Sequence, residues 1–333
     1  MRAKTIDFLD PLMYRAGERI PTMRRGASAK VRCVVEKSVR DFEYLIPASV
    51  DEAIAMRQER GEHSHFIAGG TELVPMIKQH RVEPEFLIEL SRIESLQFLH
   101  PHESGLSIGP MTTHAEIESS PWLQGPWRAL ADASASIREP QIKNLGTIGG
   151  NVGYAVPSAD SVPPLLTFGA LLKLKGPEGE RLIPMTEFLV APYRTSLRAA
   201  EVLVEIRLPE AGEGFGSAFC KLARFHGLGL SVVSVAAALK VRGGQITSAR
   251  IAFGAAAPVP RRVTEAEDFL EGKPPEPSVL REAGRLVSAA AQPRAGSIRA
   301  TPFYKREVLA PLTERALGLA VARSEGRSER GES

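Results

Sequence analysis

The sequence predicts an α+β fold with more than one domain. Its 333 residues are about twice the roughly 150 residues of a typical domain. Hydrophobic residues make up 43% and charged residues 24%, so the chain can bury a sizeable core. Short apolar strands alternate with short helical patterns, and glycine turns stand at several of the junctions. Together these observations indicate an ordinary globular protein.

The composition also limits location and chemistry. No apolar run approaches the roughly 18 residues of a membrane-spanning helix, and the N-terminus (MRAKTIDFLDPLMYRAGERI) lacks the apolar core of a secretory signal. We therefore expect a cytoplasmic protein without an integral membrane segment. The two cysteines, Cys33 and Cys220, are far apart, so neither a disulfide framework nor a cysteine-ligated metal site is predicted. An iron–sulfur cluster usually takes about four cysteines, so any electrons must come from another protein.

Residues 1–39 are interpreted as a basic N-terminal extension, because the segment is rich in Lys and Arg and has little apolar periodicity. A basic arm could contact nucleic acid or a membrane surface. However, it has neither interleaved aromatic residues nor a dense positive run, which favours a solvated or partner-contacting extension over nucleic-acid binding.

Regular elements are predicted from residue 41 onward. DFEYLIPAS predicts a short strand and a turn, and residues 50–60 predict a helix with Ser49 as N-cap and Gly61 as its stop. Residues 87–95 and 104–109 continue as strands and turns. THAEIESS predicts a helix start capped by Thr112 or Thr113, and QGPWRALADASASI predicts an amphipathic helix. Further on, SVVSVAAALKV and ITSARIAFGAA, separated by RGGQ, predict a hairpin.

The first glycine loop lies in HFIAGGTELVPMIKQH. An apolar strand, Phe66 to Ala68, runs into Gly69 and Gly70, and a segment of helical spacing follows from Leu73. Without side chains, the main chain can approach an anion closely, and the N–H groups at a helix start favour a phosphate. The signal is weak alone: such a pair is often only a turn, and the GxGxxG spacing is missing.

The second glycine loop lies in GTIGGNVGYAVPSAD. Its glycines are Gly146, Gly149 and Gly150, while Thr147 and Asn151 can bond to phosphate or ribityl oxygens. Asp160, at the end of the stretch, can accept hydrogen bonds from hydroxyls. Two such loops suit a long diphosphate cofactor.

AGGTELVPMIK, PQIKNLGTIGGN and PSADSVPPLL together resemble the FAD-binding (medium) subunit of the molybdenum hydroxylase family. This family includes the carbon monoxide dehydrogenase medium chain and the FAD domain of xanthine dehydrogenase. The resemblance keeps order and spacing from about residue 41 to 320. It implies a two-lobed PCMH-type FAD-binding domain at 41–213, a C-terminal α+β domain with an antiparallel sheet plus helices at 214–320, and a polar tail at 321–333.

The resemblance also implies which residues hold FAD. The first loop would wrap the pyrophosphate, the second would form another cradle, Asp160 would hold sugar or ribityl hydroxyls, and three further residues would lie near the flavin ring. In that order the residues are Ile67, Ala68, Gly69, Gly70, Thr71, Glu72, Leu73; Thr147, Gly149, Gly150, Asn151; Asp160; and Ile137, Leu203, Lys221. No metal ligand and no catalytic acid or base is implied.

Leu203 also stands out by its position in EVLVEIRL. Alternation places Val202, Val204, Ile206 and Leu208 on one face, leaving Leu203 beside Glu205 and Arg207 on the other. A lone Leu on a polar face needs a cover, which could be a flavin ring or merely a neighbouring loop. Lys221 could bias flavin redox chemistry or stand by a nicotinamide site, although most lysines are simply solvated.

The sequence departs from the family pattern after Lys221. Many relatives have an Arg and then an acid, whereas ARFHGLGL places Gly229 or Leu230 at the acidic position. This puts a polar network on that side of the ring, and the identity of the acceptor, in doubt. No cysteine-rich insertion follows TIGGN, so an extra cluster is not expected. His63 and His65 precede the first loop but do not lie in it, so we expect non-covalent FAD and no metal site.

The resemblance therefore implies an oxidoreductase flavoprotein subunit that transfers electrons. It would take them from 2Fe-2S clusters in a small partner subunit, fed by a molybdopterin site in a large partner subunit, and pass them to NAD or a quinone-type acceptor. A dimer of heterotrimers is expected. The alternatives are a stand-alone PCMH-type flavin oxidoreductase and a non-redox module that binds phosphate or nucleotide.

Overall fold

The structure is a computed structural model that describes residues 39–225 and 228–327. Apart from its last residue, the predicted N-terminal extension lies outside the described residues, as does the end of the predicted polar tail. The chain from Asp41 onward is one structural unit, and it is the unit described below. Within the described residues, no helix is both long and apolar enough to cross a membrane.

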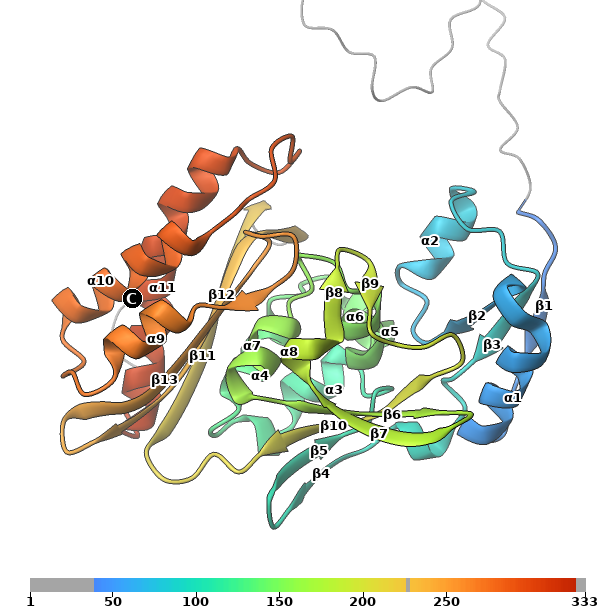
Figure 1. Ribbon diagram of the computed structural model, residues 1–333, viewed down its shortest axis with the longest axis horizontal. Helices are drawn as coiled ribbons and strands as arrows, with labels where there is room; N and C mark the ends of the chain where they lie inside the picture. The colour runs from blue at the N-terminus through green and yellow to red at the C-terminus, as the bar shows by residue number, and fades with distance from the viewer. Residues whose placement is uncertain (1–38, 226–227, 328–333) are drawn as a thin grey trace, which may run out of the picture. The chain divides into compact units, whose positions relative to one another are not determined.

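The first lobe is built on a three-stranded parallel sheet in the order β1-β3-β2 (Figure 1). Its elements are β1 (Glu43–Leu45), α1 (Val50–Arg60), η1 (Gly61–His63), β2 (Ser64–Ile67), α2 (Leu73–Lys78), β3 (Phe86–Glu89) and η2 (Glu94–Leu96). Ser49 caps α1 by accepting a hydrogen bond from the Glu52 N–H, and Gly61 ends the helix at a φ of 58°, as predicted. Because β2 ends at Ile67, the sheet presents the first glycine loop at its carboxyl edge.

The second lobe is built on a five-stranded antiparallel sheet in the order β4-β5-β10-β6-β7. Its strands are β4 (Leu99–His102), β5 (Gly105–Ile108), β6 (Leu171–Gly176), β7 (Gly179–Pro184) and β10 (Val202–Pro209). The remaining elements are α3 (His114–Ser119), η3 (Pro121–Leu123), α4 (Arg128–Ala135), α5 (Pro140–Leu145), α6 (Ile148–Tyr154), α7 (Val162–Phe168), α8 (Met185–Phe188), and the small pair β8 (Leu189–Ala191) and β9 (Arg194–Thr195). Thr113, one of the two predicted caps, forms a capping box with Glu116 at the start of α3.

A β-bulge in β10 overturns the predicted alternation around Leu203. The pairing with β6 shifts register between Leu203 and Glu205, so that Leu203 pairs with Leu174 and Ile206 with Leu172. An extra residue in one strand reverses the side-chain alternation beyond it. Leu203 therefore shares the buried face with Ile206 and is 7% exposed, rather than standing on the polar face. Val202 and Val204 pack instead in a separate apolar cluster with α1.

The C-terminal part is an antiparallel sheet in the order β11-β12-β13-β14 with three helices. Its elements are β11 (Phe215–Phe225), β12 (Leu228–Arg242), β13 (Gln245–Gly254), β14 (Arg261–Arg262), α9 (Thr264–Leu270), α10 (Pro277–Ala290) and α11 (Pro302–Ser324). The predicted hairpin is β12-β13, turning at Gly243 and Gly244, which both have positive φ. The last helix, α11, is continuous and contains Pro311.

The C-terminal sheet is buried on both faces, which explains its Ala- and Val-rich strands. On one face, Phe219, Ala236 and Ala252 join the core of the second lobe. On the other, Cys220, Val235 and Phe253 pack under α9, α10 and α11. Figure 1 shows these helices on one side of the strands and α4 and α7 on the other. Residues of β11 and β12 can thereby reach a site in the lobes.

Candidate cofactor-binding site

A cavity of about 690 Å³ brings together the two glycine loops and the start of the C-terminal sheet. All fifteen sequence-predicted residues line it: Ile67, Ala68, Gly69, Gly70, Thr71, Glu72, Leu73, Ile137, Thr147, Gly149, Gly150, Asn151, Asp160, Leu203 and Lys221. The lining also includes residues that the sequence reasoning did not assign to the site, among them His114, Glu139 and Tyr154. The volume lies in the range of pockets that hold cofactor-sized molecules.

The first loop offers unused main-chain donors. The N–H groups of residues 69–72 have no hydrogen-bond partner among the described residues. Gly70 has a φ of 69°, a conformation that favours glycine. A Cβ on Gly69 would lie 1.8 Å from the carbonyl oxygen of Leu145, so the first loop packs directly against the segment that begins the second. Donors at a helix start that lack internal partners suit an anionic group.

The second loop is different, because the protein itself uses most of its N–H groups. Gly149 donates to the Pro110 oxygen at 2.8 Å, and Gly150 donates to the Thr147 side chain at 3.1 Å, which caps α6. A Cβ on Gly149 would lie 2.5 Å from the Pro110 Cβ, whereas one on Gly150 would meet only the Thr147 hydroxyl at 3.0 Å and Ala68 at 3.8 Å. The loop therefore offers a bare surface at Gly150 rather than a row of free donors.

Asp160 and Lys221 form a buried ion pair in the cavity wall. The Lys221 Nζ lies 2.6 Å from Asp160 Oδ2, and Ser231 donates to Oδ1 at 2.5 Å. The two charged side chains are only 8% and 7% exposed. Asp160 follows α6, whereas Lys221 and Ser231 come from β11 and β12. Each oxygen of the Asp160 carboxylate, which we expected to bind ligand hydroxyls, thus already has a partner within the protein. These two bonds connect the second lobe to the C-terminal sheet.

His114 supports the second loop from behind. Its main-chain N–H donates to the Gly146 carbonyl oxygen at 3.0 Å, and its ring Nδ1 lies 3.3 Å from the Ser134 hydroxyl. Burial, together with the positive charges of Lys143 and Lys221, lowers the pKa of His114 to about 4. The ring is therefore neutral at physiological pH. The sequence patterns did not assign His114 to the site; its place directly after the Thr113 cap is the signal that could have linked it to the loop.

Glu72 connects the first loop to α6. The Tyr154 hydroxyl, Arg299 and Arg81 lie near enough to its carboxylate to act on its charge. Burial raises the pKa of Glu72, and these three partners oppose that shift. Tyr154 in turn packs edge-on against Tyr193, with ring centroids 5.4 Å apart. The polar rim on this side of the cavity was not readable from sequence, because its members come from four distant segments.

Glu139 stands near the position where the sequence departs from the family pattern. The Gly229 N–H donates to Glu139 Oε1 at 3.1 Å, and Gly229, Leu230 and Glu139 all line the cavity. A carboxylate from the residue before α5 thus lies beside the segment that follows Lys221. A single-sequence pattern could not reveal this, since the two positions are 90 residues apart.

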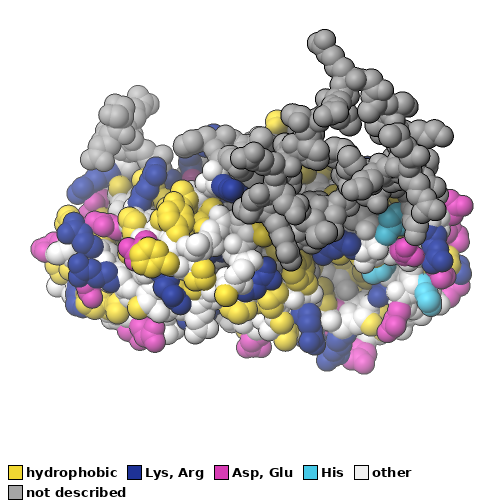
Figure 2. All heavy atoms as spheres, turned by 90° about the horizontal axis from the view of Figure 1, so that it is seen from above, with side chains coloured by type: hydrophobic (Ala, Val, Ile, Leu, Met, Phe, Trp, Pro, Cys, Tyr) yellow, Lys and Arg dark blue, Asp and Glu magenta, His cyan; other side chains and the backbone are white. Residues whose placement is uncertain are grey.

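The histidines before the first loop differ in position. Figure 2 shows histidine side chains over the first lobe. The Nδ1 of His63 lies 3.5 Å from Oε1 of Glu85, whereas His65 lines the cavity. Burial lowers the pKa of His65, and the positive charge of Arg57 lowers it further. In the part of the chain that the structure describes, no group of three His, Cys, Asp or Glu side chains could hold a metal ion.

Two family models match consecutive parts of the chain. One, described as the FAD binding domain in molybdopterin dehydrogenase, matches residues 40–211. The other, described as the CO dehydrogenase flavoprotein C-terminal domain, matches residues 217–320. These matches place the protein in the class of FAD-binding flavoproteins.

Curated relatives and solved structures narrow this class. The chain is 34% identical to the carbon monoxide dehydrogenase medium chain of Hydrogenophaga pseudoflava, over 85% of this chain and 98% of that one. It is 30% identical to the xanthine dehydrogenase FAD-binding subunit of Escherichia coli O157:H7, over 86% and 99%. A solved carbon monoxide dehydrogenase from H. pseudoflava matches with a TM-score of 0.82 at 35% identity, covering 85% of this chain and 98% of that one. The chain therefore belongs to the family of FAD-binding medium subunits of molybdenum hydroxylases, which are oxidoreductases, as the sequence resemblance predicted.

The residues present fit FAD. The unused N–H groups of the first loop can bind a diphosphate, and the open surface at Gly150 is a place that any side chain would fill. Lys221 and Asp160 place an ion pair in the wall, and Leu203 and Ile137 add apolar surface. A site with donors for an anion and an apolar wall for a ring matches the two ends of a flavin nucleotide.

Proposed function

We propose that this protein is the electron-transfer subunit of a heterotrimeric molybdenum hydroxylase, in the cytoplasm. In this proposal FAD is held non-covalently and receives electrons from 2Fe-2S clusters of a small partner subunit. A large molybdopterin subunit oxidises the substrate, NAD or a quinone-type molecule accepts the electrons, and the complex is a dimer of heterotrimers. The observation that carries the proposal is one cavity lined both by residues 69–72, whose N–H groups have no partner among the described residues, and by the second glycine loop.

Each part of the wall has a role in this proposal. The first loop binds the pyrophosphate through its N–H groups, and the second loop lets the ligand approach the main chain at Gly150. Asp160 holds the Lys221 ammonium at one position in the wall, so that a positive charge stands at a defined place beside the ligand. Leu203 and Ile137 exclude water. When bound, FAD supplies the capacity to take up two electrons singly and pass them on.

The domain boundaries are part of the same proposal. We infer an FAD-binding domain at 41–213 and a C-terminal domain at 214–320, with the boundary in the segment between β10 and β11. The buried contacts of Lys221 and Ser231 with Asp160 support a C-terminal domain that completes the site rather than one that acts separately.

The test is the absorbance spectrum of the chain purified with co-expressed neighbouring gene products, before and after acid precipitation. We expect flavin bands near ~450 nm that move to the supernatant as FAD, with iron–sulfur absorbance from the co-purifying chains. Flavin that stays in the pellet, or that is reduced by an organic substrate without partner chains, would favour the stand-alone oxidoreductase. A sample that stays colourless after addition of FAD would overturn the proposal.

A further inference from the structure

The segment from Leu197 to Leu203 is a wall between two cavities. Leu197, Glu201, Val202 and Leu203 line the FAD cavity, while residues 198–201 line a second pocket of about 610 Å³. Glu201 lines both. At Glu201 the wall therefore has a cavity on each side, whereas Ala200, Val202 and Leu203 are packed in apolar clusters.

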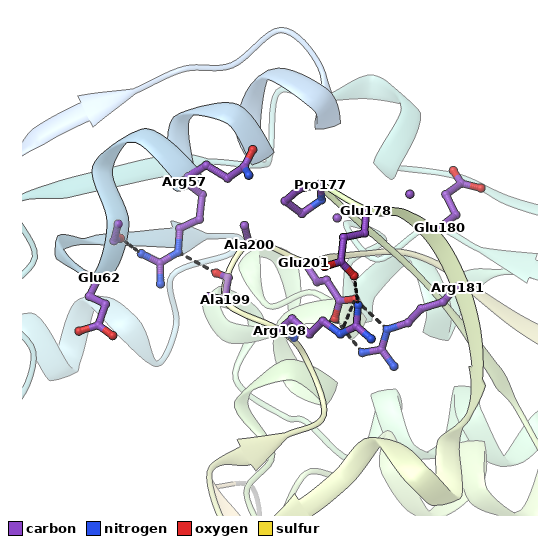
Figure 3. A pocket seen from close by; sticks show the side chains of 14 residues that line it. Arg57, Glu62, Pro177, Glu178, Glu180, Arg181, Arg198, Ala199, Ala200 and Glu201 are labelled. Atoms are coloured by element: carbon purple, nitrogen blue, oxygen red, sulfur yellow. Dashed lines mark hydrogen bonds and ion pairs between the residues drawn. The ribbon is translucent and has the colours of Figure 1, made fainter.

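Two arginines hold this wall from different elements (Figure 3). Arg57 of α1 donates through Nε to the Ala199 oxygen at 3.1 Å. Arg181 of β7 donates to both carboxylate oxygens of Glu201, each at 2.7 Å, and to the Ser196 oxygen at 2.8 Å. The wall is thus fastened to both lobes.

The Glu201 carboxylate is buried and hydrogen-bonded on both oxygens. Its side chain is 5% exposed, and its Oε2 also accepts from the Arg198 N–H at 2.8 Å. The hydrogen bonds from Arg181 lower the pKa of Glu201 despite its burial, so the carboxylate is charged. A Cβ on Gly176 would lie 2.7 Å from the Glu201 Cγ, so glycine at the end of β6 leaves room for the Glu201 stem.

The position of Leu203 in the cavity wall is linked to that of Glu201. Only one residue separates them, and the bulge that turns Leu203 toward the cavity follows directly. Val202 and Leu203 pair with Lys175 and Leu174 of β6, and the register shifts only before Glu205. The anchor at Glu201 therefore lies directly ahead of this short paired stretch and acts with it to set where Leu203 lies.

We propose that Glu201, clamped by Arg181, is a positioning residue for the FAD site, which sets the cavity wall at Leu203. This inference rests on the proposed FAD function. It concerns how the wall is held, and it assigns no direct contact between Glu201 and the cofactor.

The chain offers a closely matched control. In the C-terminal part, Glu267 accepts from Arg262 through both oxygens and from the Ile251 N–H at 2.8 Å. The side-chain exposures are 29% and 4% for Arg262 and Glu267, against 29% and 5% for Arg181 and Glu201. Glu267 does not line the FAD cavity. Loss of either carboxylate charge should therefore have a similar cost for folding.

The experiment compares Glu201→Gln with Glu267→Gln in the full chain. We measure the FAD dissociation constant, the visible circular dichroism of bound flavin and its reduction potential. In E201Q we expect the dissociation constant to rise about tenfold, because a wall that adopts its binding position in about a tenth of the molecules raises the apparent dissociation constant by that factor. We also expect the dichroism and potential to move from their wild-type values. In E267Q we expect both flavin signals to match wild type, although both variants unfold at lower denaturant.

The outcomes separate the two hypotheses. If the wild-type chain binds no FAD, the proposed function fails. If it binds FAD but E201Q and E267Q give the same flavin signals, the positioning role is wrong. Should E201Q not fold, Arg181→Lys keeps the charge and loses the two-pronged geometry. A flavin dichroism unchanged in that folded variant would likewise overturn the inference.

Discussion

The glycines of the two loops are required for different structural reasons. At Gly69 and Gly149 a Cβ would overlap neighbouring main-chain or side-chain atoms, so these glycines allow segments to pack closely. At Gly150 the space beyond the Thr147 hydroxyl is open toward the first loop. Of these three positions, Gly150 is the one where an added side chain would require the least adjustment, a small shift of the Thr147 hydroxyl.

We predict that Gly150→Val retains the fold but lowers bound FAD to less than about a tenth of the wild-type content, because its side chain would occupy the bare surface. Flavin released by acid, measured per protein chain, checks this. Gly125→Ala, where a Cβ would have no neighbour within 4 Å and which lies outside the cavity lining, is the control that should keep full FAD. Normal FAD content in Gly150→Val would show that the loop does not face the cofactor.

Asp160→Asn should destabilise the protein strongly. The change leaves the Lys221 ammonium, 8% exposed, without its carboxylate. Removing one partner of a buried pair costs about 3–5 kcal/mol in the free energy of unfolding. Urea unfolding checks this, with Glu180→Gln as control: its pair with Lys173 is 44% and 28% exposed, and such a pair contributes about 0–1 kcal/mol. Equal costs for the two variants would contradict the assigned burial.

His114 should make stability depend on pH. Its pKa is about 4 in the folded protein and 6.5 when unperturbed. Above pH 6.5 both states are neutral; between these values the unfolded state binds a proton that the folded state does not. Stability should therefore fall as pH falls from 6.5 to 4, by up to about 3 kcal/mol. Urea unfolding across this range should show a shallower fall for His114→Asn, and an identical slope would refute the assignment.

At the scale of elements, capping explains why short helices form beside the cavity. The helix α3 has only 6 residues, yet it begins with a complete capping box. The Thr113 side chain accepts from the Glu116 N–H, and the Glu116 side chain accepts from the Thr113 N–H. The main chain around Thr113 also forms a β-bridge with the main chain around Thr147, the cap of α6. One cap therefore connects to the other, and both lie at the second glycine loop.

Thr113→Ala should lower the free energy of unfolding by about 1 kcal/mol, as loss of an N-cap does, and also weaken FAD binding through the bridge to Thr147. Ser49→Ala removes the cap of α1, which does not line the cavity. It should cost about the same stability while leaving the FAD dissociation constant unchanged. Fluorescence titration of FAD with each variant checks the difference; equal dissociation constants would exclude coupling between the caps.

Local signals predicted the elements that depend on neighbouring residues. Ser49 and Gly61 bound α1 as expected, and the paired glycines at 243 and 244 turn the hairpin. The bulge in β10 was not predicted, because a bulge depends on how the strand pairs with β6 and not on its own alternation. Leu203 consequently lines the cavity for a different reason from the one that its strand pattern gave.

At the scale of the whole molecule, the predicted residues meet in one cavity, but their partners could not be read from sequence. Asp160 bonds to residues 61 and 71 positions away, and Glu139 to one 90 positions away. Such pairs have no periodicity or spacing that a single sequence displays. The family resemblance predicted the residues that line the cavity. Only the folded structure shows which of them bond to one another.

FAD should stabilise the whole chain, since the site exists only when both lobes and the C-terminal sheet are folded. At a free concentration of 100 times its dissociation constant, a ligand specific for the folded state adds about 2.7 kcal/mol. Chemical unfolding of the FAD-free chain with and without added FAD checks this. Gly150→Val is expected to gain almost nothing, and a full gain in that variant would indicate stabilisation from another site.

The contact between β11 and Asp160 has a consequence for biosynthesis. The first glycine loop leaves the ribosome early and the second about 80 residues later, but Lys221 and Ser231 complete the wall only after both. A nascent chain that ends before β11 has both loops and lacks the residues that fix Asp160. We therefore expect stable capture of flavin only after about two thirds of the chain has been made, which places cofactor loading late in synthesis.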